Sequence, residues 1–114
     1  MATSRSAKGK WTAGALLYSG RRDPTWAIPS RLAQRLLKIW DSAERWTGDQ
    51  PAPPPLGFRG CFLRDSENRQ WHAFGGVITL RAGEAMESRR DSEGEFEKLL
   101  LTSAPDGMLP HGFL

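Results

Sequence analysis

The sequence predicts an α+β fold, a two-layer sandwich in which a three- to four-stranded, mainly antiparallel sheet carries two helices on one face. Three observations lead to this class. One long segment repeats its apolar residues with helical periodicity, several short segments alternate as strands do, and a second helical pattern follows near the C-terminus. The predicted order along the chain is strand, helix, strand, strand, helix.

The composition is that of an ordinary globular domain. The chain has 114 residues, 39% of them hydrophobic and 25% charged, and no run approaches the ~18 apolar residues that a membrane span requires. The apolar run at 13–18 is too short for a secretory signal, and the single cysteine, Cys61, permits no internal disulfide. We therefore expect a cytoplasmic protein with one domain over residues 11–114.

The excess positive charge lies at the N-terminus. Arg5, Lys8 and Lys10 account for the whole formal net charge of +3, because the other 13 of the 16 basic residues are matched by 13 acidic ones. The polar composition of residues 1–10 predicts a flexible basic arm. Since the remaining chain is neutral, a nucleic acid is not the expected main partner.

The first strand is predicted at residues 12–19 and the longest helix at residues 30–46. Pro29 disfavours helical geometry in the residue before it, and Ser30 is expected to cap the helix. The apolar residues of the helix then recur near the 3.6-residue period, as Leu32, Ala33, Leu36, Leu37, Trp40 and Ala43.

A proline-rich segment follows this helix. Residues 49–57 contain four prolines, which lack the backbone N–H that a helix or sheet needs, so the segment is predicted to be a stiff, extended connector. The run at 53–55 also fits a ligand of an SH3-like domain. A rigid loop explains the prolines without a partner, and we favour the connector.

Two further strands are predicted as an antiparallel pair at residues 58–64 and 70–81, joined through the polar residues 65–69. The pair Gly75-Gly76 interrupts the second strand and indicates a β-bulge or the close approach of another backbone.

The C-terminal part of the chain is predicted to hold a loop, a helix and a tail. Residues 82–91 are polar and indicate a loop. Ser92 and Glu95 fit a capping box ahead of apolar residues at helical spacing, so a second helix is expected at 92–103. The tail at 104–114 either packs as an extended strap or stays loose.

The connection between the first strand and the first helix is the candidate binding site. Residues 20–26 combine a glycine, two guanidinium groups, a carboxylate that can form an Asx-turn, and an indole. Arginine offers a bidentate fork for a carboxylate or phosphate, and an indole offers flat apolar contact. With two residues of the predicted hairpin, the candidate ligand-binding residues are Arg21, Arg22, Asp23, Trp26, Arg59 and Trp71.

A structural role for the same loop carries equal weight. In that alternative Arg21 and Arg22 pair with Asp23 or Asp65, and Trp26 fills the edge of the core.

The sequence shows no catalytic or metal-binding motif. Two histidines and one cysteine provide no ligand spacing typical of zinc, so no catalytic residue, metal or cofactor is predicted. A Cys61/His72 dyad across the predicted hairpin would define a small enzyme. A cysteine between Gly60 and Phe62 is more often a small packed residue, and we favour that interpretation.

The aromatic content suggests one more alternative. Five tryptophans are present, and Trp71, Phe58 and Phe74 on a sheet beside Arg59 are loosely similar to the stacking platforms of single-strand nucleic-acid binders. The neutral charge of residues 11–114 argues against this function.

Three segments resemble a set of short bacterial proteins of unassigned function. The segments are YSGRRDPTW at 18–26, LGFRG at 56–60 and GGV at 75–77, where those proteins carry YSGRPNPxW, LGYRGF and a GG-V segment. This chain has Arg22-Asp23 in place of Pro-Asn. The resemblance covers most of residues 14–80 and implies a shared fold and a shared importance of the loop, but no activity.

These observations together predict a small non-enzymatic binding or protein-interaction module, in which the 20–26 loop takes an anionic group or a peptide. The alternatives are a small enzyme that uses Cys61 and His72, and nucleic-acid binding through the basic arm and the aromatic sheet face. A protein or peptide partner is expected, and no association with a membrane.

Overall fold

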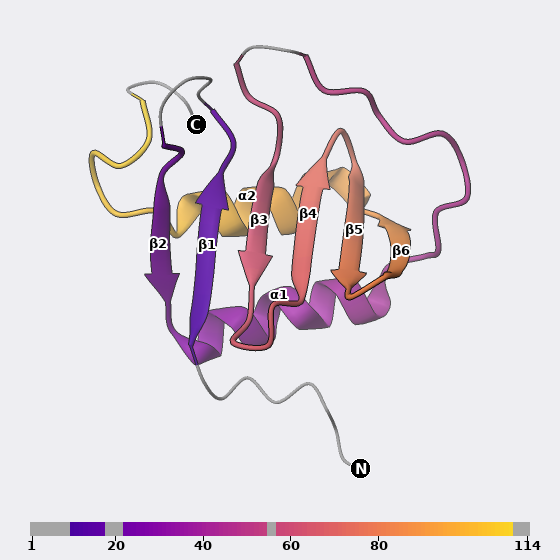
Figure 1. The fold of residues 1–114 in the computed structure, drawn as a ribbon, viewed down its shortest axis with the longest axis horizontal. Helices are drawn as coiled ribbons and strands as arrows, with labels where there is room; N and C mark the ends of the chain where they lie inside the picture. The colour runs from indigo at the N-terminus through magenta and orange to yellow at the C-terminus, as the bar shows by residue number, and fades with distance from the viewer. Residues whose placement is uncertain (1–9, 18–21, 55–56, 111–114) are drawn as a thin grey trace.

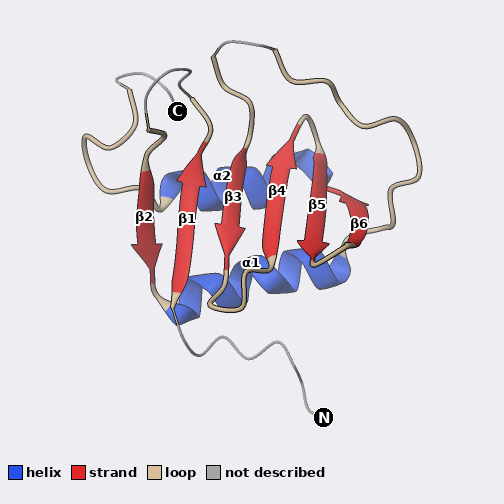
Figure 2. Ribbon diagram, in the orientation of Figure 1, coloured by secondary structure: helices blue, strands red, loops and turns tan. Residues whose placement is uncertain are grey.

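The computed structural model describes residues 10–17, 22–54 and 57–110. It shows a six-stranded antiparallel sheet in the order β2-β1-β3-β4-β5-β6, with both helices behind it (Figure 1, Figure 2). The strands are β1 (Trp11–Ala15), β2 (Thr25–Ile28), β3 (Cys61–Arg64), β4 (Gln70–Phe74), β5 (Val77–Ala82) and β6 (Ala85–Arg90). The helices are α1 (Ser30–Ser42) and α2 (Glu95–Thr102), the latter preceded by a 3₁₀ turn at Ser92–Gly94.

The α+β class is therefore confirmed, whereas the predicted sheet of three to four strands and the predicted element order are wrong. Several expectations fall outside the described residues. These are the basic arm up to residue 9, the end of the first predicted strand at 18–19, Arg21, the proline at position 55, and the tail from residue 111.

The core lies between the sheet and the two helices. Alternate strand residues face the helices, among them Ala13, Leu63 and Ile78, and each of these three is fully buried. Leu36 of α1 and Leu100 of α2 complete the same cluster. Neither α1 nor α2 covers the other face of the sheet, and we call it the open face.

Two strands were not predicted. β2 has only four residues and pairs with β1 at the edge of the sheet, with Trp26 opposite Ala13. β6 was predicted as a loop because its residues are mostly polar. Its helix-facing positions are Glu87 and Arg89, and Arg89 lies over the ring of Trp40 at 4.3 Å instead of presenting an apolar side chain to α1.

The pair Gly75-Gly76 forms a hairpin turn, so the predicted bulge within one long strand is wrong. Both glycines have positive φ, 62° and 85°, as a two-residue hairpin requires. The chain reverses there, and the segment predicted as one strand becomes β4 and β5, paired from Phe74↔Val77 to Gln70↔Arg81.

Helix α1 ends four residues earlier than predicted because the chain after it pairs with β6. The Trp46 amide donates to the Ser88 carbonyl at 2.9 Å, and the Arg90 amide donates to the Glu44 carbonyl at 2.8 Å. An extended segment cannot also be helical. At the helix start, Ser30 makes no capping bond, and the carbonyl of Pro29 accepts from the first amides instead.

The connection from α1 to β3 runs along the β6 side of the sheet (Figure 1). Of the proline-rich connector predicted at 49–57, the described residues 49–54 and 57 form no helix or strand, as expected. Residues 58–60, predicted as the start of a strand, lie outside β3. Pro51 packs on Gly75, where a side chain would collide with the proline ring. The connector therefore rests on the β4–β5 turn and covers the upper end of the open face.

Helix α2 is present, but the predicted capping box is not what starts it. Ser92 and Glu95 make no side-chain capping bond. The carboxylate of Asp91 instead accepts the amides of Phe96 at 2.8 Å and Glu97 at 3.1 Å. After α2 the tail turns and packs as far as it is described, with Met108 against the core.

Candidate functional site

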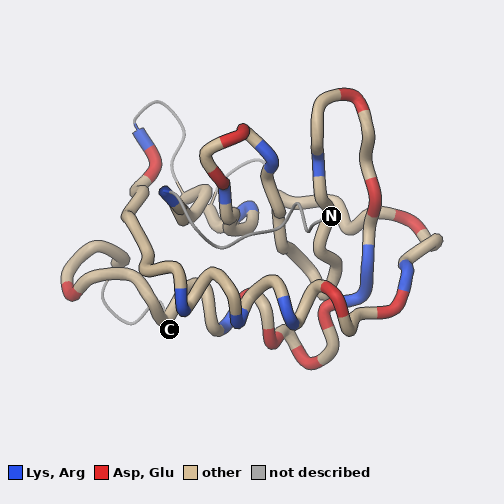
Figure 3. The backbone as a smooth tube through the Cα atoms, turned by 90° about the horizontal axis from the view of Figure 1, so that it is seen from below, with Lys and Arg blue, Asp and Glu red and all other residues tan. Residues whose placement is uncertain are grey.

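The open face carries basic but no acidic strand residues in the part of the chain that the structure describes. Its charged or titratable positions are Arg64 on β3, His72 on β4, Arg81 on β5 and Arg90 on β6. Acidic residues lie in the turns, in the connector, in the helices or on the helix side of β6 (Figure 3). The open face is therefore a positively charged surface on a chain that is nearly neutral elsewhere.

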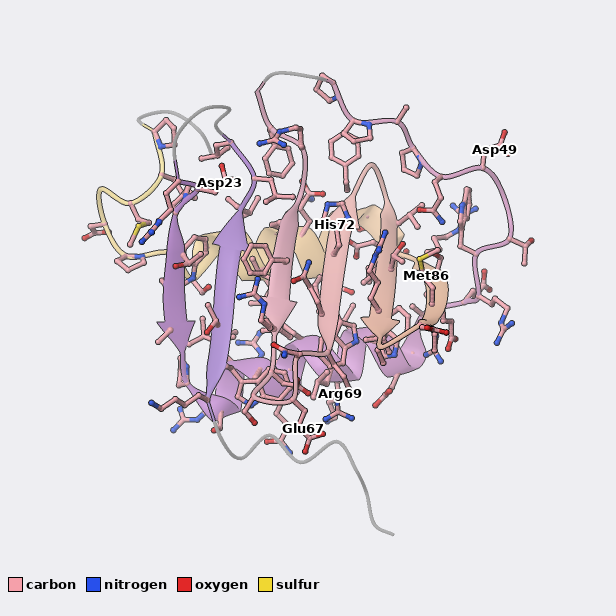
Figure 4. All side chains as sticks on the ribbon, in the orientation of Figure 1. Asp23, Asp49, Glu67, Arg69, His72 and Met86 are labelled. Carbon is pink, nitrogen blue, oxygen red and sulfur yellow. The ribbon has the colours of Figure 1, made fainter. Side chains whose placement is uncertain are left out.

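A cleft of about 440 Å³ lies on this face, over strands β4 to β6. Figure 4 shows His72 and Met86 on the side of the sheet that is turned away from the helices. We call this hollow the open-face cleft, and its lining residues are Gln50, Gln70, His72, Thr79, Arg81 and Met86.

Arg81 is the cation of the cleft that no carboxylate neutralises. It is exposed, and its guanidinium makes no hydrogen bond or ion pair among the described residues. The other two arginines of the open face are stacked on rings, Arg64 over Phe62 at 4.8 Å and Arg90 over Trp46 at 5.1 Å. The guanidinium of Arg81 keeps all five donors for a ligand.

His72 is held in one orientation by the backbone of the segment just before β3. Its Nε2 lies 3.1 Å from the carbonyl oxygen of Arg59, so Nε2 carries the proton and donates. Gly60 makes this approach possible. A methyl group there would overlap the imidazole, and the φ of Gly60 is +114°, which disfavours other residues.

The pKa of His72 is lowered, first by burial of the imidazole and further by the positive charge of Arg81, against an opposing effect of the Arg59 carbonyl. At neutral pH the ring is therefore uncharged, with Nδ1 as a free acceptor within the described residues. Protonation of Nδ1 would add a second positive charge beside Arg81.

A small polar network fixes the far wall of the cleft. Gln50 of the connector donates to Ser88 of β6 at 2.8 Å and accepts from Thr79 of β5 at 3.3 Å, while the two hydroxyls lie 2.9 Å apart. Gln70 accepts from Arg64 through its oxygen. Its amide nitrogen remains a donor without a partner in the described chain, so the open-face cleft offers donors from two strands.

The sequence-predicted binding residues do not converge on one site. Trp26 is buried in the core with its Nε1 donating to Ser103 at 2.9 Å, and Trp71 is fully buried on the helix-covered face. In this conformation neither indole reaches a surface ligand. Arg22 is exposed without a partner in the described residues, while Arg21 lies outside them.

Asp23 and Arg59 do come together, in a structural arrangement. The carboxylate of Asp23 accepts the amide of Leu17 at 2.8 Å and lies 3.8 Å from the guanidinium of Arg59. The carbonyl of the same Arg59 holds His72. The loop thus anchors the segment that orients a residue of the open-face cleft.

Cys61 and His72 lie on opposite faces of the sheet, so the structure does not form the dyad considered from the sequence. In the β3–β4 register Cys61 lies opposite Ala73 and Phe62 lies opposite His72. Cys61 is completely buried toward the helices. Burial, with the charges of Glu97 and Asp91, raises the pKa of its thiol well above the usual value, which opposes thiolate formation.

The described residues hold neither a cluster of metal ligands nor a membrane-spanning helix. Within 10–17, 22–54 and 57–110 no three potential ligands among His, Cys, Asp and Glu gather in a geometry suited to a metal ion. No helix in these ranges has the length and apolar character needed to cross a bilayer.

Comparisons with known proteins add no assignment: no protein-family model matches the chain, and neither the curated proteins nor the solved structures include a match. The resemblance to short bacterial proteins therefore stays a prediction.

The cleft was missed because its residues are ordinary in sequence. Gln70, Thr79 and Arg81 belong to no motif, and only the β4–β5 hairpin brings them together. The available signal was the strand alternation itself, which places Thr79 and Arg81 on one face if the chain reverses at Gly75-Gly76.

Proposed function

We propose that this protein is a small non-enzymatic binding module that takes an anionic group in the open-face cleft. The observation that carries the proposal is Arg81, an arginine without a carboxylate partner on a sheet face whose strands contain no acid among the described residues. A planar guanidinium binds carboxylate or phosphate through two parallel hydrogen bonds.

The surroundings of Arg81 support the same class of ligand. The amide nitrogen of Gln70 and the ring of His72 lie along the same cleft and can donate to a bound anion, His72 after protonation of Nδ1. Arg64 and Arg90 add positive potential without blocking the cleft, since each is stacked on its own aromatic ring.

The 20–26 loop has a supporting role in this proposal. Asp23 contacts the Arg59 guanidinium, and the Arg59 carbonyl orients His72. The loop therefore stabilises one wall of the cleft indirectly, through Arg59. The narrower prediction, in which the loop itself holds the anion, now rests on Arg22 among its described residues. Trp26 and Trp71 are buried and contribute stability instead.

A binding function fits the cleft better than either alternative. His72 hydrogen-bonds a carbonyl and not a nucleophile, and Thr79 bonds to Gln50 and Ser88. For nucleic acid, the aromatic rings do not form an open stacking platform, because Phe58 and Phe74 are half-buried and lie against each other with ring centroids 6.0 Å apart. Phe62 is 4% exposed and Trp71 lies on the other side of the sheet.

The test is an amide-resolved NMR titration with sulfate, compared with sodium chloride at equal ionic strength. Saturable shifts are expected at Gln70, His72, Thr79 and Arg81. Arg81→Gln should weaken sulfate binding about tenfold or more, as expected for the loss of a charge-assisted bidentate contact.

The matched control is Arg31→Gln, which removes another exposed arginine, from α1 in the helix layer. This variant should bind sulfate as the parent protein does. Equal losses in both variants, or shifts that do not saturate, would show general charge screening and would overturn the proposal.

A further inference from the structure

The outer edge of β6 is paired over only half its length. Residues 44–46 bond to Ser88 and Arg90, and the chain then turns away into the connector. The first half of β6, from Ala85 to Glu87, has no neighbouring strand on its outer side among the described residues.

The direction of the free backbone groups follows from the bonds that are made. Ser88 accepts from Trp46 and Arg90 donates to Glu44, so these two residues point their backbone groups outward. In an antiparallel strand this direction alternates with period two. The amide and carbonyl of Met86 therefore also point outward, and no described residue pairs with them.

A second hollow, of about 430 Å³, lies at this unpaired edge. We call it the edge notch, and its lining mixes apolar and polar residues: Arg45, Trp46, Thr47, Leu80, Ala82, Ala85, Met86, Glu87 and Ser88. Met86 lines both the edge notch and the open-face cleft, and with 60% of its surface exposed it is the exposed large hydrophobic residue of the described chain. A partly apolar hollow and an anion site thus adjoin at one unpaired strand residue.

We propose that the ligand is an extended acidic peptide that adds a strand to β6 at Met86. This inference rests on the function proposed above and names its ligand. A residue opposite Met86 in the added strand would exchange two backbone hydrogen bonds with it and point its side chain onto the open face. The residues on either side would point the other way, toward the edge notch.

The charges select an acidic side chain for the position opposite Met86. Arg81 lies directly across from Met86 in the β5–β6 register. It is therefore two strand spacings, roughly 10 Å between backbones, from the added strand, which a glutamate and an arginine can bridge with their side chains. The strand acid near this edge, Glu87, is already paired with Arg89 at 2.9 Å.

The experiment uses a seven-residue peptide with blocked ends, in which one glutamate stands between two leucines. Two matched peptides carry glutamine for the glutamate, or a methyl group on the glutamate nitrogen. Fluorescence anisotropy measures affinity. The parent peptide is expected to bind about tenfold or more tightly than either control, because each control lacks one charge-assisted or backbone contact.

Three protein variants assign these differences to residues. Arg81→Gln should abolish the preference for glutamate over glutamine. Met86→Pro removes the outward amide, which would donate to the glutamate carbonyl, and leaves the hydrogen bonds to β5 in place, so it should weaken binding of the parent peptide, whereas Met86→Ala should not. Circular dichroism confirms folding of each variant, and the methylated peptide tests strand pairing without any substitution.

The outcomes separate this inference from the function on which it rests. Sulfate binding at Arg81 together with equal affinity for the methylated and unmethylated peptides would overturn strand addition alone. If sulfate does not bind and the protein shows no preference for the glutamate peptide over the glutamine peptide, both the proposed function and strand addition would be overturned. Tighter binding of an oligothymidylate with the same charge than of the parent peptide would replace the peptide by a nucleic acid and overturn the inference.

Discussion

At the scale of single residues, three aspartates organise the turns of this protein by accepting backbone amides. Asp23 accepts from Leu17, Asp65 from Glu67 and Arg69, and Asp91 from the first turn of α2. The carboxylate satisfies N–H groups that no strand or helix partner reaches, which is how a short polar side chain fixes a turn.

The loop at 20–26 therefore divides into a structural and a free part. Asp23→Ala should lower the free energy of unfolding by about 1–2 kcal/mol, because it leaves the Leu17 amide and the Arg59 guanidinium without this carboxylate. Arg22→Ala should change it by less than about 0.5 kcal/mol, as expected for an exposed side chain without a partner in the described residues. Urea denaturation of both variants measures the difference, and a larger loss for Arg22→Ala would reverse the assignment.

At the scale of elements, β6 links the sheet to both helices. Arg89 on its helix side donates to the carbonyl of Trp40 at 2.7 Å, near the end of α1, and Asp91 just after it starts α2. The polar sequence of β6 is explained by these contacts, because an arginine stacked on an indole replaces the apolar residue that strand alternation would predict.

The start of α2 provides the prediction at this scale. Asp91→Ala should cost about 1–3 kcal/mol of unfolding free energy, since the buried carboxylate holds two amides of the first turn. Ser92→Ala, the neighbouring change at the residue that the sequence marked as the cap, should cost less than about 0.5 kcal/mol. Thermal melts of the two variants measure these losses. An equal loss of unfolding free energy in Asp91→Ala and Ser92→Ala would mean that Ser92 caps the helix as the sequence predicted.

At the scale of the whole molecule, the sequence predicted the layers better than the sheet. The stripe of α1 and the apolar pattern of α2 are long enough to set their own periodicity, and both helices form. Two strands were not predicted: β2, because it is a four-residue edge strand just before Pro29, and β6, because its residues are mostly polar. Their existence depends on partners far away in sequence, which local patterns do not encode.

For the candidate site, too, the sequence predicted part of the arrangement and missed the part that depends on contacts between distant segments. The sequence identified Asp23 and Arg59, which the fold brings together, but it grouped them with two tryptophans that the core needs. Arg81 becomes notable only through its surroundings, an acid-free sheet face within the described chain and a cleft shared with His72. Those surroundings are a property of the register of six strands, and no single segment contains them.

The central claim, that an anion binds beside Arg81 and His72, predicts a change in the pKa of His72. In the free protein burial and Arg81 hold this pKa below its ordinary value of 6.5. A bound anion offsets the charge of Arg81 and favours the imidazolium, so the pKa should rise. Sulfate affinity should then increase as pH falls through the interval between the free and bound pKa values, and a pKa higher by one corresponds to about a tenfold gain in affinity.

The most direct measurement is an NMR pH titration of the His72 imidazole with saturating sulfate and with sodium chloride at equal ionic strength. Replacing the second histidine, His111, by glutamine leaves one ring to follow. We predict a higher pKa in sulfate and no such difference in the Arg81→Gln protein. The same pKa of His72 in both salts would contradict an anion site in the open-face cleft.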